Sequence, residues 1–232
     1  MAGSLVQATS KQVSGVSSTT ISFASSVTAG SFIAVFTTSW FNNSSSATDN
    51  QSGNSYSSLV AGDVGGASPF VRILGAHNVA ASGTFTVTVN FAGSADATII
   101  IAEFSGVATS SAAEVANTAA GTGTAVSVST SGATTDAGDM LIGMLTHDGS
   151  TMAITETYSL IAEQENNSSS QGGSAQYRLP GSTGTHSLTW TLASSAGWIA
   201  AVVALKPAAS ASVSNVILSP LRRFGFGGLI VR

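Results

Sequence analysis

The chain contains an internal repeat of a β-strand unit, and this repeat constrains the fold more than any other feature. Residues 83–104 recur in outline as residues 184–205, at a constant offset of 101 positions (184 − 83 and 205 − 104). Each copy holds a strand of alternating apolar and polar residues, a turn of small residues and a continuous apolar strand. The duplication predicts a β-scaffold made of two homologous halves.

Further strand signals belong to the same repeat. Residues 84–91 alternate with period two, which predicts a half-buried strand. The apolar runs Phe32–Phe36 and Met140–Met144 each follow an Ala-Gly pair, and both predict central strands buried on two faces. Each half then offers roughly five or six strands, separated by turns rich in Ser, Gly, Asn and Thr. Two more pairs of segments match, namely residues 54–61 with 156–162 and residues 71–78 with 173–179.

This pattern predicts an all-β fold: an antiparallel β-sandwich, jelly-roll-like, built from two homologous halves. We expect one merged domain over residues 1–206, with halves at about 5–107 and 124–206. Two small sandwiches in tandem are the alternative. Helix signals are weak throughout, and the best of them, Ser110–Ala119, indicates one short helical turn between the halves.

Composition removes several classes of function. Only 8% of residues are charged and 43% are apolar, so the chain is too hydrophobic for disorder. It has no cysteine, which excludes disulfides and thiolate chemistry. The body has no cluster of cations for nucleic acid, and its apolar runs are shorter than the roughly 20 residues that span a membrane. The N-terminus lacks the pattern of a secretory signal, so we expect synthesis in a cytoplasm.

A separate C-terminal arm, residues 207–232, lies outside the repeat. It begins with a linker of small residues and then gathers large apolar side chains with three of the seven cations of the chain. Leaving such side chains in water costs about 1.5–3 kcal/mol each, so we expect another surface to cover them, either on a partner or on the body of the same chain. The predicted subunit-interface residues are Val216, Ile217, Leu218, Leu221, Arg222, Arg223, Phe224, Phe226, Leu229 and Ile230.

The residues that catalysis requires do not form a pattern. The three histidines, His77, His147 and His186, have no metal-ligand spacing, and no Gly-x-Ser-x-Gly elbow is present. Glu163 and Glu165 lie at a loop edge and do not suggest a glycosidase pair. We therefore predict that the chain is not an enzyme and has no cofactor or metal.

Two loops have Asp and Asn residues that could suggest calcium. One contains Asp49, Asn50 and Asn54, and the other contains Asp136 and Asp139. Neither has EF-hand spacing, and Asp and Asn are ordinary turn residues, so we favour a role in turns.

Aromatic residues suggest carbohydrate as an alternative ligand, because aromatic rings stack on sugar rings. Trp190 and Trp198 fall within the repeat and are expected in the core. Trp40 and Phe41 form the candidate ligand-facing loop, with carbohydrate as the ligand.

Several turn and core patterns together resemble a β-sandwich family found in phage structural proteins and bacterial surface proteins. The resemblance covers roughly residues 5–207 and implies the fold, but it brings no catalytic residues with it. The patterns lie at Thr48–Tyr56, Leu74–Val79, Ala102–Val107, Thr134–Gly143 and Ala196–Pro207.

The resemblance and the arm together favour a phage structural protein of the virion, either a capsid decoration or a tail-associated subunit. Its partners would be copies of itself or another virion protein, bound through the arm. Two alternatives are a host-receptor or carbohydrate-binding adhesin module and an extracellular filament subunit.

Overall fold

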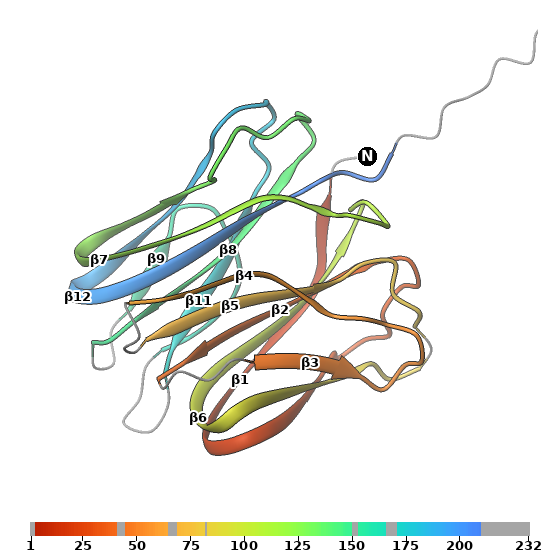
Figure 1. The fold of residues 1–232 in the computed structure, drawn as a ribbon, viewed down its shortest axis with the longest axis horizontal. Coiled ribbons are helices and arrows are strands. Elements are labelled where there is room, and N and C mark those ends of the chain that lie inside the picture. The colour runs from red at the N-terminus through yellow and green to blue at the C-terminus, as the bar shows by residue number, and fades with distance from the viewer. Residues whose placement is uncertain are drawn as a thin grey trace, which may run out of the picture.

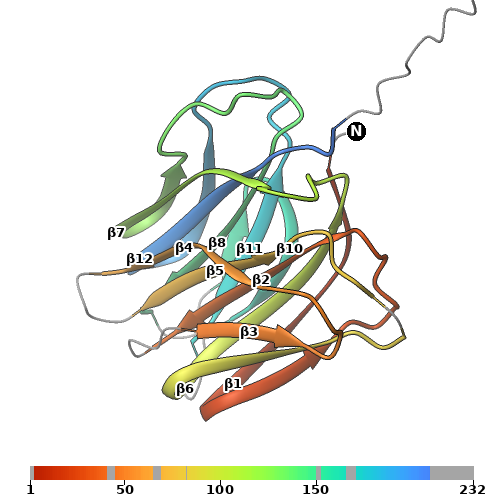
Figure 2. The ribbon, with the colours of Figure 1, turned by 45° about the vertical axis from the view of Figure 1, so that its right-hand side comes forward.

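The computed structural model describes residues 3–40, 45–64, 69–81, 83–149, 153–165 and 171–209. Within these residues the chain forms twelve strands and no helix. The strands make two antiparallel sheets of six strands each, and the sheets lie face to face (Figures 1 and 2). The predicted all-β antiparallel sandwich with two halves is confirmed.

The first sheet has the strand order β1-β6-β2-β5-β4, and β3 pairs with one end of β6. All its strands come from the first half of the chain. They are β1 (Ser4–Ser22), β2 (Phe32–Ser39), β3 (Ser45–Asp49), β4 (Ser57–Asp63), β5 (Phe70–Ala76) and β6 (Thr86–Ser105).

The second sheet repeats this topology with the order β10-β11-β8-β12-β7, and β9 pairs with β12. Adding six to each label of the first sheet gives the second, so the duplication covers every strand. These strands are β7 (Ala113–Ser129), β8 (Met140–His147), β9 (Ile154–Glu156), β10 (Ser159–Gln164), β11 (Gly173–Arg178) and β12 (Ser187–Leu205).

The central strands β2 and β8 are buried along all eight of their residues, as their sequences predict. Each lies between two other strands, and continuous apolar side chains pack on both faces. The long strand β6 changes character along its length. Buried and half-buried residues alternate at its start, where it pairs with β3, and residues 97–104 are fully buried beside β2.

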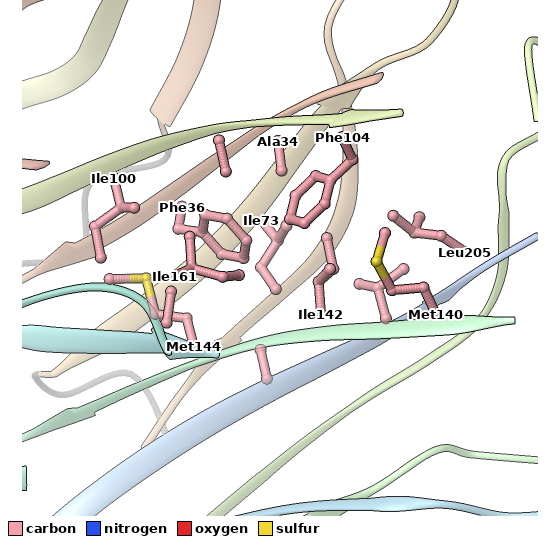
Figure 3. Packing of buried hydrophobic residues seen from close by; sticks show 14 of the residues in the cluster. Ala34, Phe36, Ile73, Ile100, Phe104, Met140, Ile142, Met144, Ile161 and Leu205 are labelled. Atoms are coloured by element: carbon pink, nitrogen blue, oxygen red, sulfur yellow. The ribbon is translucent and has the colours of Figure 1, made fainter. Parts of the chain in front are cut away.

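The core between the two sheets is formed by one face of each half. Figure 3 shows Phe36 and Phe104 of the first sheet directed toward Ile142 and Met144 of the second. The outer face of each sheet has its own smaller core. Side chains on alternate positions of β2 and β8 therefore serve two different cores.

The edges of the two sheets meet in a symmetric way. β1 lies over β10, where the Gln164 side-chain amide donates to the Ser10 hydroxyl at 2.8 Å. β4 lies over β7, where a Cβ on Gly62 would come within 2.8 Å of Thr118. Because β1 corresponds to β7 and β4 to β10, an approximate twofold axis relates the halves.

A buried polar cluster also joins the sheets. Thr98 of β6 donates its hydroxyl to the Gln171 carbonyl at 2.6 Å, and Thr146 of β8 donates to the Gly172 carbonyl at 2.7 Å. Thr38 of β2 accepts from the Thr98 backbone N–H at 3.2 Å. Buried polar groups must find partners, so this cluster favours one alignment of the halves over a sliding apolar contact.

The expected helical turn at Ser110–Ala119 is wrong. Residues from Ala113 onward belong to β7, which pairs with the outer edge of β12 from Ala113↔Leu205 to Ser129↔Ser187. An unpaired edge on β12 would leave a row of backbone groups without hydrogen bonds, so strand pairing outweighs a weak local helix preference.

The shared core predicts that Phe36→Ala destabilises the whole protein. We expect a loss of about 3–5 kcal/mol in unfolding free energy, because a fully buried ring is removed from the contact between sheets. Urea titration followed by circular dichroism and tryptophan fluorescence should give one transition, shifted as a unit. Val6→Ala, at a side chain that is 50% exposed, should change stability by less than about 0.5 kcal/mol. Two transitions, only one of them shifted, would show independent halves.

Candidate functional site

The described chain ends at the edge of the sandwich, where three backbone hydrogen bonds hold its last residues. Lys206 N–H donates to the Ala112 carbonyl at 2.8 Å, and Ala208 N–H donates to the Gly106 carbonyl at 2.7 Å. Ala108 N–H donates to the Lys206 carbonyl at 2.9 Å. We call residues 206–208 the arm root. It is fixed to the linker of residues 106–112, which joins the two halves.

A pair of carboxyl groups lies next to the arm root. Glu114 of β7 accepts from the Thr135 backbone N–H at 3.2 Å, and the Thr135 hydroxyl also donates to it. Asp139, which is 1% exposed, accepts from the Asp136 backbone N–H at 3.1 Å. Gly138, in the same turn, faces the Pro207 ring of the arm root; a Cβ there would come within 3.2 Å of it.

These two carboxyl groups share the charge unequally. Burial raises the pKa of Asp139 to about 6, and the neighbouring Glu114 adds to this effect. Burial also acts to raise the pKa of Glu114, but hydrogen bonds with Thr135 and Asp139 and the charge of Lys206 lower it overall. The pair therefore consists of an ionised Glu114 beside an Asp139 that holds a proton in mildly acidic solution.

The variant Asp139→Asn tests this pair through the pH dependence of stability. The pKa of Asp139 is about 6 in the folded protein and 3.8 for an ordinary Asp side chain. Between these two pH values the folded chain binds more protons at Asp139 than the unfolded chain does, so the contribution of Asp139 to stability rises as pH falls through that window. Asn cannot titrate. The variant should therefore gain most relative to wild type at pH 7, and the gain should shrink by pH 4.5.

Urea unfolding at both pH values measures this difference, with the exposed Glu165→Gln as a control that should shift little at either. Burial lowers the pKa of His147, which makes wild type and variant alike lose stability below about pH 6.5, so the comparison cancels this effect. A difference between Asp139→Asn and wild type that does not vary with pH would contradict the assignment.

A pocket of about 130 Å³ opens at the edge of the inter-sheet core, beside the linker. Phe32, Gly75 and Ala112 in its lining are buried, whereas Ser57 and His77 are exposed. It is thus an apolar hollow with a polar rim. The complete lining is Phe32, Ser57, Leu59, Gly75, His77, Ser111, Ala112 and Ala113.

The predicted arm interface, Val216 to Ile230, lies outside the described residues, and so does Phe41. Trp40 is described: it follows β2, is partly buried, and its backbone N–H donates to the Asp96 carbonyl at 3.0 Å. Trp190 and Trp198 are 1% and 8% exposed, which confirms that they belong to the core.

The Asp49 loop has the structure of a hydrogen-bonded turn. The Asp49 carboxylate accepts from the Gln51 backbone N–H, the Asn54 amide and the Tyr56 hydroxyl, all at 2.8–2.9 Å. Asn50 accepts from the Thr86 backbone N–H at 2.9 Å. Donors thus surround Asp49, which agrees with a turn role.

The titratable residues considered for chemistry lie apart. Glu103 is fully buried and accepts from the Gln7 amide, the Thr28 N–H and the Ser31 hydroxyl, each at 2.8 Å. His147 is buried at the end of β8, whereas His77 is exposed after β5. Across the described ranges, no three His, Asp or Glu residues are grouped to hold a metal ion.

Comparisons of the chain with protein-family models, curated proteins and solved structures give no match. The resemblance to phage and bacterial surface sandwiches therefore rests on the sequence patterns alone. None of the segments that the structure describes is a helix able to cross a membrane.

Sequence reasoning missed both the pocket and the carboxyl pair. The linker and the turn before β8 are separated by more than twenty residues, and Glu114 comes to Asp139 because both β7 and β8 pair with β12. The sequence repeat aligns residues 71–78 with 173–179 and so sets Gly75, which lines the pocket, against Tyr177. Only the strand register shows that these two residues are equivalent.

Proposed function

We propose that this chain is a structural subunit of a phage particle, either a capsid decoration or a tail-associated protein, that assembles through its C-terminal arm. The observation that carries the proposal is the contrast between a body with little exposed apolar surface and an arm whose sequence is rich in apolar residues.

The body is complete as a sandwich without the arm. Its described residues include only three large apolar side chains that are substantially exposed: Val6 at 50%, Leu160 at 44% and Leu179 at 45%. They lie on different strands or strand ends, and three such side chains are too few to form an extended apolar surface. The apolar residues of the arm are thus surplus to the needs of the body core.

Charge separates the body from the arm in the same way. All eleven acidic residues lie between Asp49 and Glu165, and residues 1–209 have four basic residues, which gives a formal charge of −7. Residues 210–232 have three arginines and no acid, a charge of +3. Opposite charges favour association of the arm with a body of this same kind.

Two other functions predict different behaviour. An adhesin would bind sugars through Trp40, which is partly exposed beside the end of β2. A filament subunit would use the same arm in an open, head-to-tail array. Electron microscopy of the purified assembly separates a closed particle or ring from a fibre, and a glycan array with Trp40→Ala tests the adhesin.

Removal of residues 210–232 should abolish self-association without unfolding the body. We expect the full chain to form oligomers in analytical ultracentrifugation and the truncated chain to be monomeric. The urea midpoint of the truncated chain should match that of the monomeric full chain at low concentration, because the sandwich core is unchanged. A truncated chain that still associates and still enters particles would overturn the proposal.

A further inference from the structure

The two halves of the repeat differ at one place on the edge of the inter-sheet core. Strand register aligns them: Phe32 pairs with Phe104 in the first half, and Met140 pairs with Leu205 in the second. Two residues along, Ala34 pairs with Gly75, and Ile142 pairs with Tyr177. Gly75 therefore occupies the position that Tyr177 occupies in the other half.

Tyr177 fills this position in the second half. Its ring packs on the inter-sheet core and meets the Phe104 ring edge-on at 6.2 Å between centroids. In the first half Gly75 offers no side chain, and a Cβ there would lie 2.7 Å from Phe32 and 2.8 Å from Leu59. In the first half the space beside Gly75 is thus filled by Phe32 and Leu59, and both side chains line the pocket described above.

The pocket has the size and chemistry for one aromatic ring. A cavity of about 150 Å³ lined by Leu, Ile and Phe binds benzene in another protein, and this pocket measures about 130 Å³. Its buried lining is apolar, and its exposed rim of Ser57, His77 and Ser111 leaves it open to solvent. An aromatic side chain from outside would pack against Phe32, Leu59 and Ala112 of this lining.

We propose that a phenylalanine of the arm, from Phe224-Gly225-Phe226 of a neighbouring copy, inserts into this pocket. The inference rests on the proposed function and names its receptor site. Residues at i and i+2 of an extended chain point to one side, so either ring can enter while the other covers the rim. Arg222 and Arg223 precede them, and their positive charge suits a body of formal charge −7.

The length of the arm allows exchange between copies. Lys206 is hydrogen-bonded to Ala112, itself part of the pocket lining, so the arm starts beside the pocket of its own chain. Phe224 follows Ala209 by fifteen residues (224 − 209), which span at most roughly 50 Å, enough to reach the pocket of a neighbouring copy. Two copies related by a twofold axis can instead exchange arms reciprocally.

Complementation between two full-length variants tests the inference. Ser57→Trp obstructs the pocket from its exposed rim, and Phe224→Ala with Phe226→Ala removes the inserted rings. Each variant alone should associate about 30-fold more weakly than wild type, as expected for the loss of a buried aromatic anchor. Their mixture should recover part of the association, because the mixed pair regains one of the two reciprocal insertions: the arm of one chain enters the intact pocket of the other. A mixture that recovers nothing would overturn exchange between copies.

Cysteine pairing gives a second readout, because the natural chain has no cysteine. Ser57→Cys with Phe226→Cys should form a disulfide that doubles the mass on a non-reducing gel. The control Ser52→Cys with Phe226→Cys, at an exposed turn outside the pocket, should not. Crosslinking within a single chain, or equal yields in both pairs, would overturn the inference.

The two proposals fail in distinguishable ways. If truncation at residue 209 abolishes association but Ser57→Trp leaves it unchanged, the arm assembles the protein and the pocket is not its receptor. If truncation leaves association unchanged, the proposed function itself fails.

Discussion

The contact between the apolar faces of the two sheets is the interaction on which the rest of the structure depends. Phe36, Ile100 and Phe104 from one half meet Met140 and Ile142 from the other, and all are nearly inaccessible to solvent. A sheet with both faces apolar cannot remain alone in water, because each large side chain left exposed costs about 1.5–3 kcal/mol. Each half thus supplies the cover that the other half requires, and the duplication is explained by this mutual need.

An approximate twofold arrangement leaves few positions free to differ, so the differences indicate where the halves do separate jobs. Gly75 and Tyr177 are equivalent in register, yet Phe32 and Leu59 pack over the glycine beside a pocket, whereas the tyrosine ring itself packs on the inter-sheet core. The linker beside that pocket holds Ser111 at a positive φ of 47°, an uncommon conformation for a residue with a side chain. The carboxyl pair of Glu114 and Asp139 lies nearby, so the asymmetric features gather around the arm root.

Much of the fold could be predicted from the sequence, because strand periodicity is a local property. The buried runs at Phe32 and Met140 and the core positions of Trp190 and Trp198 follow from apolar patterns that the chain shows directly. The start of β7 has the local pattern of a helical turn, and its strand form depends on the free edge of β12, a partner over eighty residues away. Local propensity in a segment of small residues is too weak to resist such pairing.

By itself the sequence determined the all-β class, the two homologous halves and the arm rich in apolar and basic residues. These follow from periodicity, duplication and composition, each of which is a property of the sequence alone. Only the tertiary structure decided that the halves form face-to-face sheets, that Glu114 meets Asp139, and that a pocket lies beside Gly75 in one half whereas Tyr177 packs on the core in the other. These facts depend on strand register and on the packing of distant segments, and neither is specified by the local sequence around a residue.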